Sequence, residues 1–239
     1  MKNTNTLKLC SGLLFTAAVG SASATTVLID FGRTDAVAAS PYNAAAIIAT
    51  GPNGTTGALP LTDTGGFATG WTVTVTDVGS GNAGNAGAGA DVPSFPVGLA
   101  GYDATALRDS IYSNQGAGTS PAMTLLFAGL SPSATYDLIL YGSRTNAQGA
   151  DQRWSLTAGS GGAAVDHFSE LNDTTYVDWT GISPDAGGLI EVTINSPGPD
   201  TIGALALNFG SITESVIPEP SSVGLLAIGL GLFARRRRR

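Results

Sequence analysis

The sequence predicts an all-β fold, an antiparallel β-sandwich of the jelly-roll kind, on three observations. Short runs that alternate apolar and polar residues recur along the chain, as in strands with one buried face. Clusters of Gly, Pro, Asn, Ser and Asp separate these runs, as turns require. Helical periodicity is nearly absent. The predicted strands are 26–31, 71–76, 123–127, 136–141, 153–157, 189–194 and 204–209.

One short helix is expected over residues 105–112, with Asp103 or Thr105 as the cap of its first turn. The segment 79–90 is rich in Gly and Ala and carries too little apolar area to order itself. We therefore expect it to form a flexible surface loop inside a single domain.

A Leu-Ser-Pro corner at residues 130–132 is followed by Tyr136 at the start of a predicted strand. This pattern resembles the tyrosine corner of Greek-key sandwiches, including fibronectin type III domains. In such a corner the tyrosine hydroxyl bonds to a backbone group a few residues upstream. The resemblance supports the sandwich fold and carries no functional information.

The N-terminus has the three parts of a secretory signal peptide. Lys2 and Lys8 come first, an apolar run over residues 9–19 follows, and Ala22 and Ala24 form a small-x-small cleavage site. We expect a signal peptide over residues 1–24, a mature chain that begins near Thr25, and an extracellular domain over 25–213. Cys10 lies before most of the apolar run, which argues against a lipoprotein.

The C-terminus has a second compound signal, after a predicted linker at residues 214–217. Pro218, Glu219 and Pro220 precede the uncharged segment 223–234, which predicts a short transmembrane helix. About twenty apolar residues cross a bilayer comfortably, so this segment can stop translocation without being a lasting anchor. Basic residues next to such a helix orient its end toward the cytoplasm. The basic cluster consists of Arg235, Arg236, Arg237, Arg238 and Arg239.

Residues 218–239 closely resemble the PEP-CTERM sorting signal of exported proteins in Gram-negative bacteria that make exopolysaccharide. The resemblance implies that an exosortase recognises the tail and removes it at or near Pro218-Glu219-Pro220. It also implies transient contact with the inner membrane and a final location in the cell envelope, at the cell surface or in the extracellular matrix.

Removal of both ends changes the charge of the protein. The whole chain has a formal net charge of −7, but residues 25–217 contain four arginines against seventeen acidic residues, a net charge near −13. Such a domain repels nucleic acid and anionic lipid, so we expect no nucleic-acid partner. Without Cys10 it has no cysteine, which excludes disulfides, thiolate catalysis and cysteine metal sites.

No catalytic residue is expected, and we predict that the protein is not an enzyme. His167 is the single histidine, and no Gly-x-Ser-x-Gly nucleophile elbow accompanies it. Glycoside hydrolysis needs two carboxyl groups placed several ångströms apart. Glu170 and Glu191 are better explained as solvated surface residues, because no strand presents two carboxylates on one face.

Calcium is the one cofactor left open, and the identity of any metal site stays unknown. Aspartates in loop-like sequence suit this ion, although none forms a spaced Asp-x-Asp-x-Asp-Gly loop. These aspartates are Asp91, Asp103, Asp151, Asp166, Asp173, Asp178 and Asp185.

Aromatic residues are the candidates for contact with a glycan. Trp71 and Trp154 lie in predicted strands and are expected in the core. Trp179 and Tyr176 are flanked by polar residues and are the possible contacts, although core packing ranks first for Trp179 as well. The remaining candidates are Tyr42, Tyr102 and Tyr112.

Three hypotheses of function follow. The first is a non-catalytic structural or adhesive protein of an exopolysaccharide or biofilm matrix. The second is a carbohydrate-binding module for exopolysaccharide or another surface glycan, with or without calcium. The third, ranked last, is an extracellular hydrolase.

Overall fold

The computed structural model describes residues 24–32, 38–45, 55–77, 83–85, 94–108, 110–114, 122–145, 151–168, 170–196 and 204–215. Within them it has fourteen strands, one 3-10 helix and one α-helix. The strands are β1 (Thr26–Asp30), β2 (Tyr42–Ala44), β3 (Leu59–Thr62), β4 (Ala68–Asp77), β5 (Ala83–Asn85), β6 (Ile111–Asn114), β7 (Ala122–Ala128), β8 (Thr135–Tyr141), β9 (Asp151–Ala158), β10 (Val165–Phe168), β11 (Val177–Ile182), β12 (Ile190–Asn195), β13 (Ala204–Leu207) and β14 (Phe209–Ser215). The helices are η1 (Val97–Leu99) and α1 (Ala104–Arg108).

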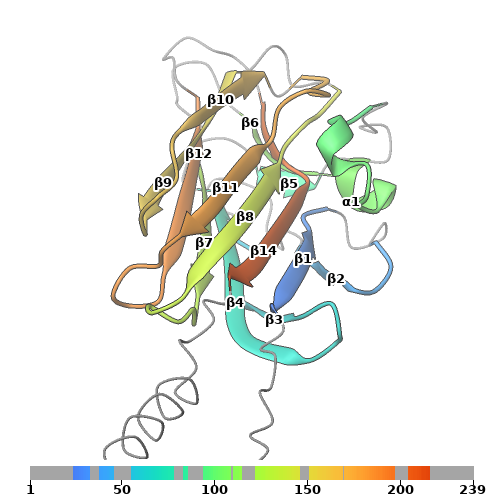
Figure 1. Ribbon diagram of the computed structural model, residues 1–239. Helices are drawn as coiled ribbons and strands as arrows, with labels where there is room; N and C mark the ends of the chain where they lie inside the picture. Colours follow the sequence, from blue (N-terminus) through green and yellow to red (C-terminus); the bar gives the residue numbers. More distant parts are fainter. Residues whose placement is uncertain are drawn as a thin grey trace, which may run out of the picture. The chain divides into compact units, whose positions relative to one another are not determined.

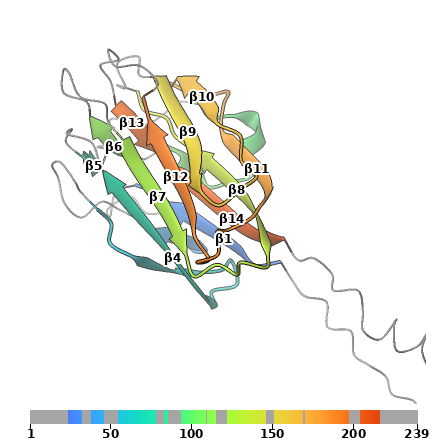
Figure 2. The same ribbon diagram turned by 90° about the vertical axis from the view of Figure 1, so that its left-hand side faces the viewer.

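The strands form two large sheets and one small sheet. The five-stranded sheet has the order β11-β8-β14-β1-β2, and the six-stranded sheet has the order β10-β9-β12-β7-β4-β3. The three-stranded sheet has the order β13-β6-β5. Among the strand pairs of the described residues, β1–β2 is parallel and the others are antiparallel. The two large sheets face each other (Figures 1 and 2), which confirms the all-β sandwich.

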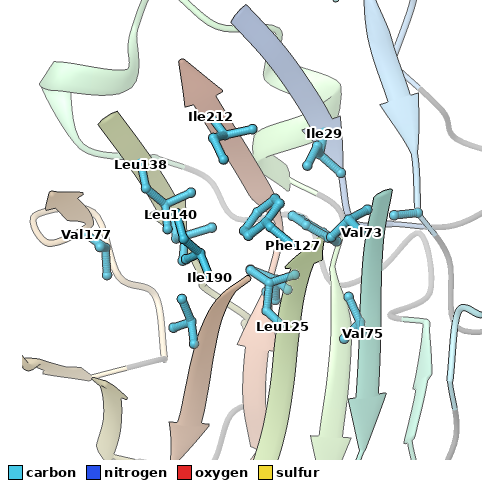
Figure 3. Close-up of a cluster of buried hydrophobic side chains, with 14 of the residues drawn as sticks. Ile29, Val73, Val75, Leu125, Phe127, Leu138, Leu140, Val177, Ile190 and Ile212 are labelled. Atoms are coloured by element: carbon cyan, nitrogen blue, oxygen red, sulfur yellow. The ribbon is translucent and has the colours of Figure 1, made fainter. Parts of the chain in front are cut away.

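The main hydrophobic core lies between the two large sheets (Figure 3). Alternate residues of each strand point inward, as the burial pattern of β7 and β12 shows. Burial of each large apolar side chain stabilises the fold by about 1.5–3 kcal/mol relative to exposure. The labelled side chains in the figure are Ile29, Leu138, Leu140, Val177 and Ile212 from the five-stranded sheet and Val73, Val75, Leu125, Phe127 and Ile190 from the six-stranded sheet.

All seven predicted strands are present, with boundaries that differ by a few residues. The predicted strand 204–209 is divided at Asn208 into β13 and β14, which belong to different sheets. Strands β2, β3, β5, β6, β10 and β11 were not predicted. Most are short, and β11 is interrupted by an irregularity between Trp179 and Ile182, so their alternation is weak in the sequence.

The helix prediction was wrong in its second half. Helix α1 ends at Arg108, and Ile111 and Tyr112 belong to strand β6. The β-branched and aromatic side chains of these residues favour a strand, and β6 pairs with β13 and β5. The expected capping interaction is present, because the Thr105 N–H donates to Asp103 Oδ1 at 2.7 Å.

Two predicted irregular segments also contain sheet residues. Strand β14 extends to Ser215, and the Glu214 N–H donates to the Thr25 carbonyl at 2.9 Å, so the predicted linker begins inside a strand. Strand β5 lies within the segment predicted to be a loop, 79–90, whose other residues are outside the described part. The predicted signal peptide up to Ser23 and the tail from residue 216 are also outside it.

The tyrosine corner is confirmed. Tyr136 is completely buried, and its hydroxyl accepts a hydrogen bond of 2.9 Å from the Ser131 N–H. Its ring also meets the edge of Trp71, with centroids 5.5 Å apart. The corner therefore joins β7 to β8, and with them the two large sheets.

Tyr136→Phe is expected to lower the free energy of unfolding by about 1 kcal/mol, because the part-buried Ser131 N–H loses its hydrogen-bond partner. Urea denaturation measures this change. An unchanged midpoint and slope would show that the corner hydroxyl does not stabilise the domain.

Candidate functional site

The outer face of the five-stranded sheet is covered at one end and open at the other. The residue partners Asp30, Phe209 and Tyr141 form a row across β1, β14 and β8 on this face. Leu99 and Leu107, from η1 and α1, pack with Phe209 and Tyr141 in a second buried cluster. Both views show α1 on the outer side of this sheet, toward one end (Figures 1 and 2).

Tyr102 lies where this cover ends. Its ring centroid is 4.4 Å from that of Phe209, and its hydroxyl lies near the side chain of Ser211 in the next row. The register aligns Ser211 with Leu28 and Ile139, and Ile139 with Asp178 on β11. Tyr102 therefore stands as a step above a row that carries Ser211 between the apolar residues Leu28 and Ile139 and ends at an exposed carboxylate, Asp178.

Two other tyrosines flank this step. The Tyr42 hydroxyl accepts a hydrogen bond of 2.7 Å from the Asp103 N–H, and its ring centroid is 6.2 Å from that of Phe209. Tyr176 precedes β11, and its hydroxyl lies so close to Gly98 that a Cβ atom on residue 98 would collide with it. All three rings are partly exposed. We call the surface formed by these residues the tyrosine surface. It consists of Tyr42, Tyr102, Tyr176, Asp178, Leu28 and Ile139.

Burial is the main cause that raises the pKa of Tyr42 and of Tyr102 above the ordinary tyrosine value. The negative charge of Asp103 adds to this effect at Tyr42, and that of Asp178 adds to it at Tyr102. The two phenols therefore stay protonated at neutral pH. Each can take part in hydrogen bonds while its ring offers apolar contact.

The third row of the face carries small polar side chains. Thr26 and Thr213 are joined by a hydrogen bond of 3.1 Å between their hydroxyls. Asp137, aligned with Thr213, accepts a hydrogen bond of 2.8 Å from the Gly181 N–H. The outer face thus changes from buried aromatic, through the tyrosine surface, to open polar within three rows.

The tryptophans lie in the core. Trp71 and Trp154 are 6% and 0% exposed, as predicted. Trp179 is 5% exposed, and its Nε1–H donates to the Ala163 carbonyl at 2.7 Å. It faces inward on β11 and packs against Gly162, so neither face of its ring is open to a sugar. Trp179 is therefore a core residue and not a glycan contact at the rim of a loop. Of the two residues proposed as glycan contacts, only Tyr176 lies on an accessible surface.

Several of the candidate calcium ligands are engaged in local structure. Asp185 Oδ1 accepts the N–H groups of Gly187 and Leu189, and Asp63 Oδ1 accepts those of Gly65 and Phe67 in an equivalent turn. Asp166 pairs with Arg153 at 2.6 and 2.7 Å. Within the described residues no three His, Cys, Asp or Glu side chains are grouped to hold a metal.

The residues considered for catalysis are not brought together. His167 lies on β10 opposite Gln152, and Glu191 lies on β12. Glu191 accepts a hydrogen bond of 2.7 Å from the Thr157 hydroxyl on the outer face of the six-stranded sheet. Glu170 forms an isolated backbone bridge with Arg144. Asp91 lies outside the described residues.

Residues 216–239 match the family model of the PEP-CTERM protein-sorting motif. The chain carries a PEP-CTERM sorting motif. This motif marks an exported, cell-surface protein that an exosortase processes. The matched segment includes Pro218, Glu219 and Pro220 and the arginines 235–239, all of which lie outside the described residues.

Two solved structures resemble the chain at TM-scores of 0.34. One is the enzymatically active domain of tailspike protein 4 of bacteriophage CBA120, 15% identical over 60% of this chain and 19% of that one. The other is the isomalto-dextranase of Arthrobacter globiformis T6 complexed with panose, 19% identical over 80% of this chain and 32% of that one. The chain thus spans less than a third of the length of either.

No curated protein sequence matches the chain. Among the helices of the described residues, none is both long enough and apolar enough to span a membrane.

Proposed function

We propose that the mature domain is a non-catalytic adhesive module that holds this exported PEP-CTERM protein to extracellular polysaccharide. The observation that carries the proposal is the tyrosine surface. Partly exposed tyrosine rings at a step, with polar groups on one side, suit the apolar faces and the hydroxyl groups of a sugar ring. The proposal combines the first two hypotheses, an adhesive matrix protein and a carbohydrate-binding module, and assigns the binding to the tyrosine surface.

The non-catalytic part of the proposal is supported by the structural use of four described carboxylates. Asp63 and Asp185 stabilise turns, Asp103 caps α1, and Asp137 accepts a backbone N–H of β11. Groups engaged in such hydrogen bonds hold loops in place. We propose no hydrolytic reaction, and we place the protein in the polysaccharide matrix of a Gram-negative bacterium.

Calcium-assisted binding is the second candidate. Its support is the net charge near −13 of residues 25–217, which attracts divalent cations. Retention of matrix polysaccharide, measured with EDTA and with added calcium, separates the two candidates, because only calcium-assisted binding depends on the ion.

The test is retention of matrix polysaccharide by the domain from Thr25 to Ile217, which lies in one compact unit. Tyr102→Ala is expected to weaken binding at least tenfold, because the step loses the ring that a sugar would contact. Gly98→Ala should also weaken it, because the new methyl group displaces Tyr176.

Tyr112→Ala is the matched control. Tyr112 is a partly exposed tyrosine of the three-stranded sheet, stacked under Arg144 at 3.7 Å, and its loss should leave polysaccharide binding unchanged. If the folded domain retains no polysaccharide, or if Tyr102→Ala and Tyr112→Ala behave alike, the proposed function is wrong.

A further inference from the structure

We propose that the tyrosine surface selects polysaccharides with free amino groups, that is, hexosamine units without the N-acetyl group, and that Asp178 binds their ammonium groups. This inference rests on the proposed function and specifies the chemical class of the glycan.

Asp178 is placed to meet a ligand at the step. It lies on β11 between the buried residues Val177 and Trp179, so its side chain points to the outer face and is exposed. It is aligned with Ile139, in the row over which Tyr102 stands. It is near enough for its charge to act on the Tyr102 hydroxyl.

No basic residue of the described part neutralises this carboxylate. Asp178 has no salt bridge there, while Arg153 pairs with Asp166 and Arg144 lies over the Tyr112 ring. The remaining described arginine, Arg108, is at the end of α1. A ligand that carries a positive charge can therefore pair with this exposed carboxylate beside the aromatic rings.

Tyrosine rings add to this preference. An ammonium group close to the face of an aromatic ring is attracted by the ring quadrupole, as in the aromatic sites that bind alkylammonium ligands. The rings of Tyr102 and Tyr176 are both partly exposed on the tyrosine surface. An amino sugar can thus stack its ring on the step and place its ammonium group between Asp178 and the tyrosines.

The charge of the whole domain favours the same class of ligand. At a net charge near −13, residues 25–217 attract cationic polymers and repel uronic-acid polymers. Neutral glycans gain nothing from this field. The long-range part of the attraction is screened over roughly 8–10 Å at 0.10–0.15 M salt, so binding of an amino glycan should weaken as salt is added.

The test compares two chito-oligosaccharides of equal length, one fully de-N-acetylated and one fully N-acetylated, by calorimetric titration into the domain from Thr25 to Ile217. We expect the de-N-acetylated form to bind at least about fivefold more tightly. A fivefold ratio of affinities corresponds to about 1 kcal/mol, the upper end of the free energy that an exposed ion pair contributes. Asp178→Asn should remove most of the difference and leave only the part that the charge of the whole domain provides. Glu191→Gln, which removes one charge from the outer face of the other large sheet, should preserve it.

Equal affinity for the two oligosaccharides, or the same loss in Asp178→Asn and Glu191→Gln, would overturn the amino-sugar inference. Absence of binding by the de-N-acetylated form would overturn it as well. In that case the proposed function would still stand if the unchanged domain retains matrix polysaccharide and Tyr102→Ala weakens this retention. If the unchanged domain retains no matrix polysaccharide, both the proposed function and the amino-sugar inference are wrong.

Discussion

Asn208→Ala is expected to lower the free energy of unfolding by about 3 kcal/mol. Asn208 is completely buried at the junction of β13 and β14. Its Nδ2–H donates to the Leu107 carbonyl at 3.0 Å, and its Oδ1 accepts the Ser143 N–H at 2.7 Å. Each buried backbone group left without a partner costs about 1–3 kcal/mol. Chemical denaturation of the domain measures the loss.

Asn43→Ala is the matched control. Asn43 also bridges backbone groups through its side-chain amide, but it is partly exposed, so water can replace the lost hydrogen bonds. Its Nδ2–H groups donate to the carbonyls of Leu28 and Thr62, and its Oδ1 accepts the Thr62 N–H, each at 2.9 Å. A cost of about 1 kcal/mol is expected there. Equal costs at Asn43 and Asn208 would show that burial does not govern the contribution of these amides.

The sorting motif gives the second large effect. Replacement of Pro218, Glu219 and Pro220 with alanine should prevent removal of the tail, because these residues lie in the matched PEP-CTERM segment. The protein should then remain in the membrane fraction with its C-terminal arginines. Mass spectrometry of the fractionated protein reads out the change.

Replacement of Ser221 and Ser222 with alanine tests whether any change near the motif has this effect. This control lies in the same segment but leaves the Pro-Glu-Pro sequence intact. Normal processing in the control and none in the triple-alanine variant is expected. Normal processing of both would defeat the assignment of Pro218-Glu219-Pro220 as the processing signal.

The fold was predictable where a single strand carries its own signal. β7 and β12 alternate buried and partly exposed residues along their whole length, and the Tyr136 corner is a local pattern. Strand β11 carries a weaker signal because the irregularity after Trp179 breaks its alternation. Local patterning therefore identified the sandwich but missed several edge and short strands.

The candidate site was mostly hidden from the sequence because it depends on long-range pairing. Tyr102 and Asp178 are far apart in the chain, and the pairing of β11, β8, β14 and β1 with the cover by α1 brings them together. Tyr176 was named for its polar neighbours, and it lies on this surface. Trp179 shares those neighbours but faces the core, since strand side chains alternate. Only the register distinguishes the two.

The central claim is that polysaccharide binds at the tyrosine surface. Amide hydrogen exchange of the domain from Thr25 to Ile217, with and without matrix polysaccharide, locates the contact directly. We predict slower exchange around Tyr102, in the segment 94–103 and in β11, and no change on β4, β7 and β12. Protection of the six-stranded sheet, with unchanged exchange around Tyr102, would contradict the account.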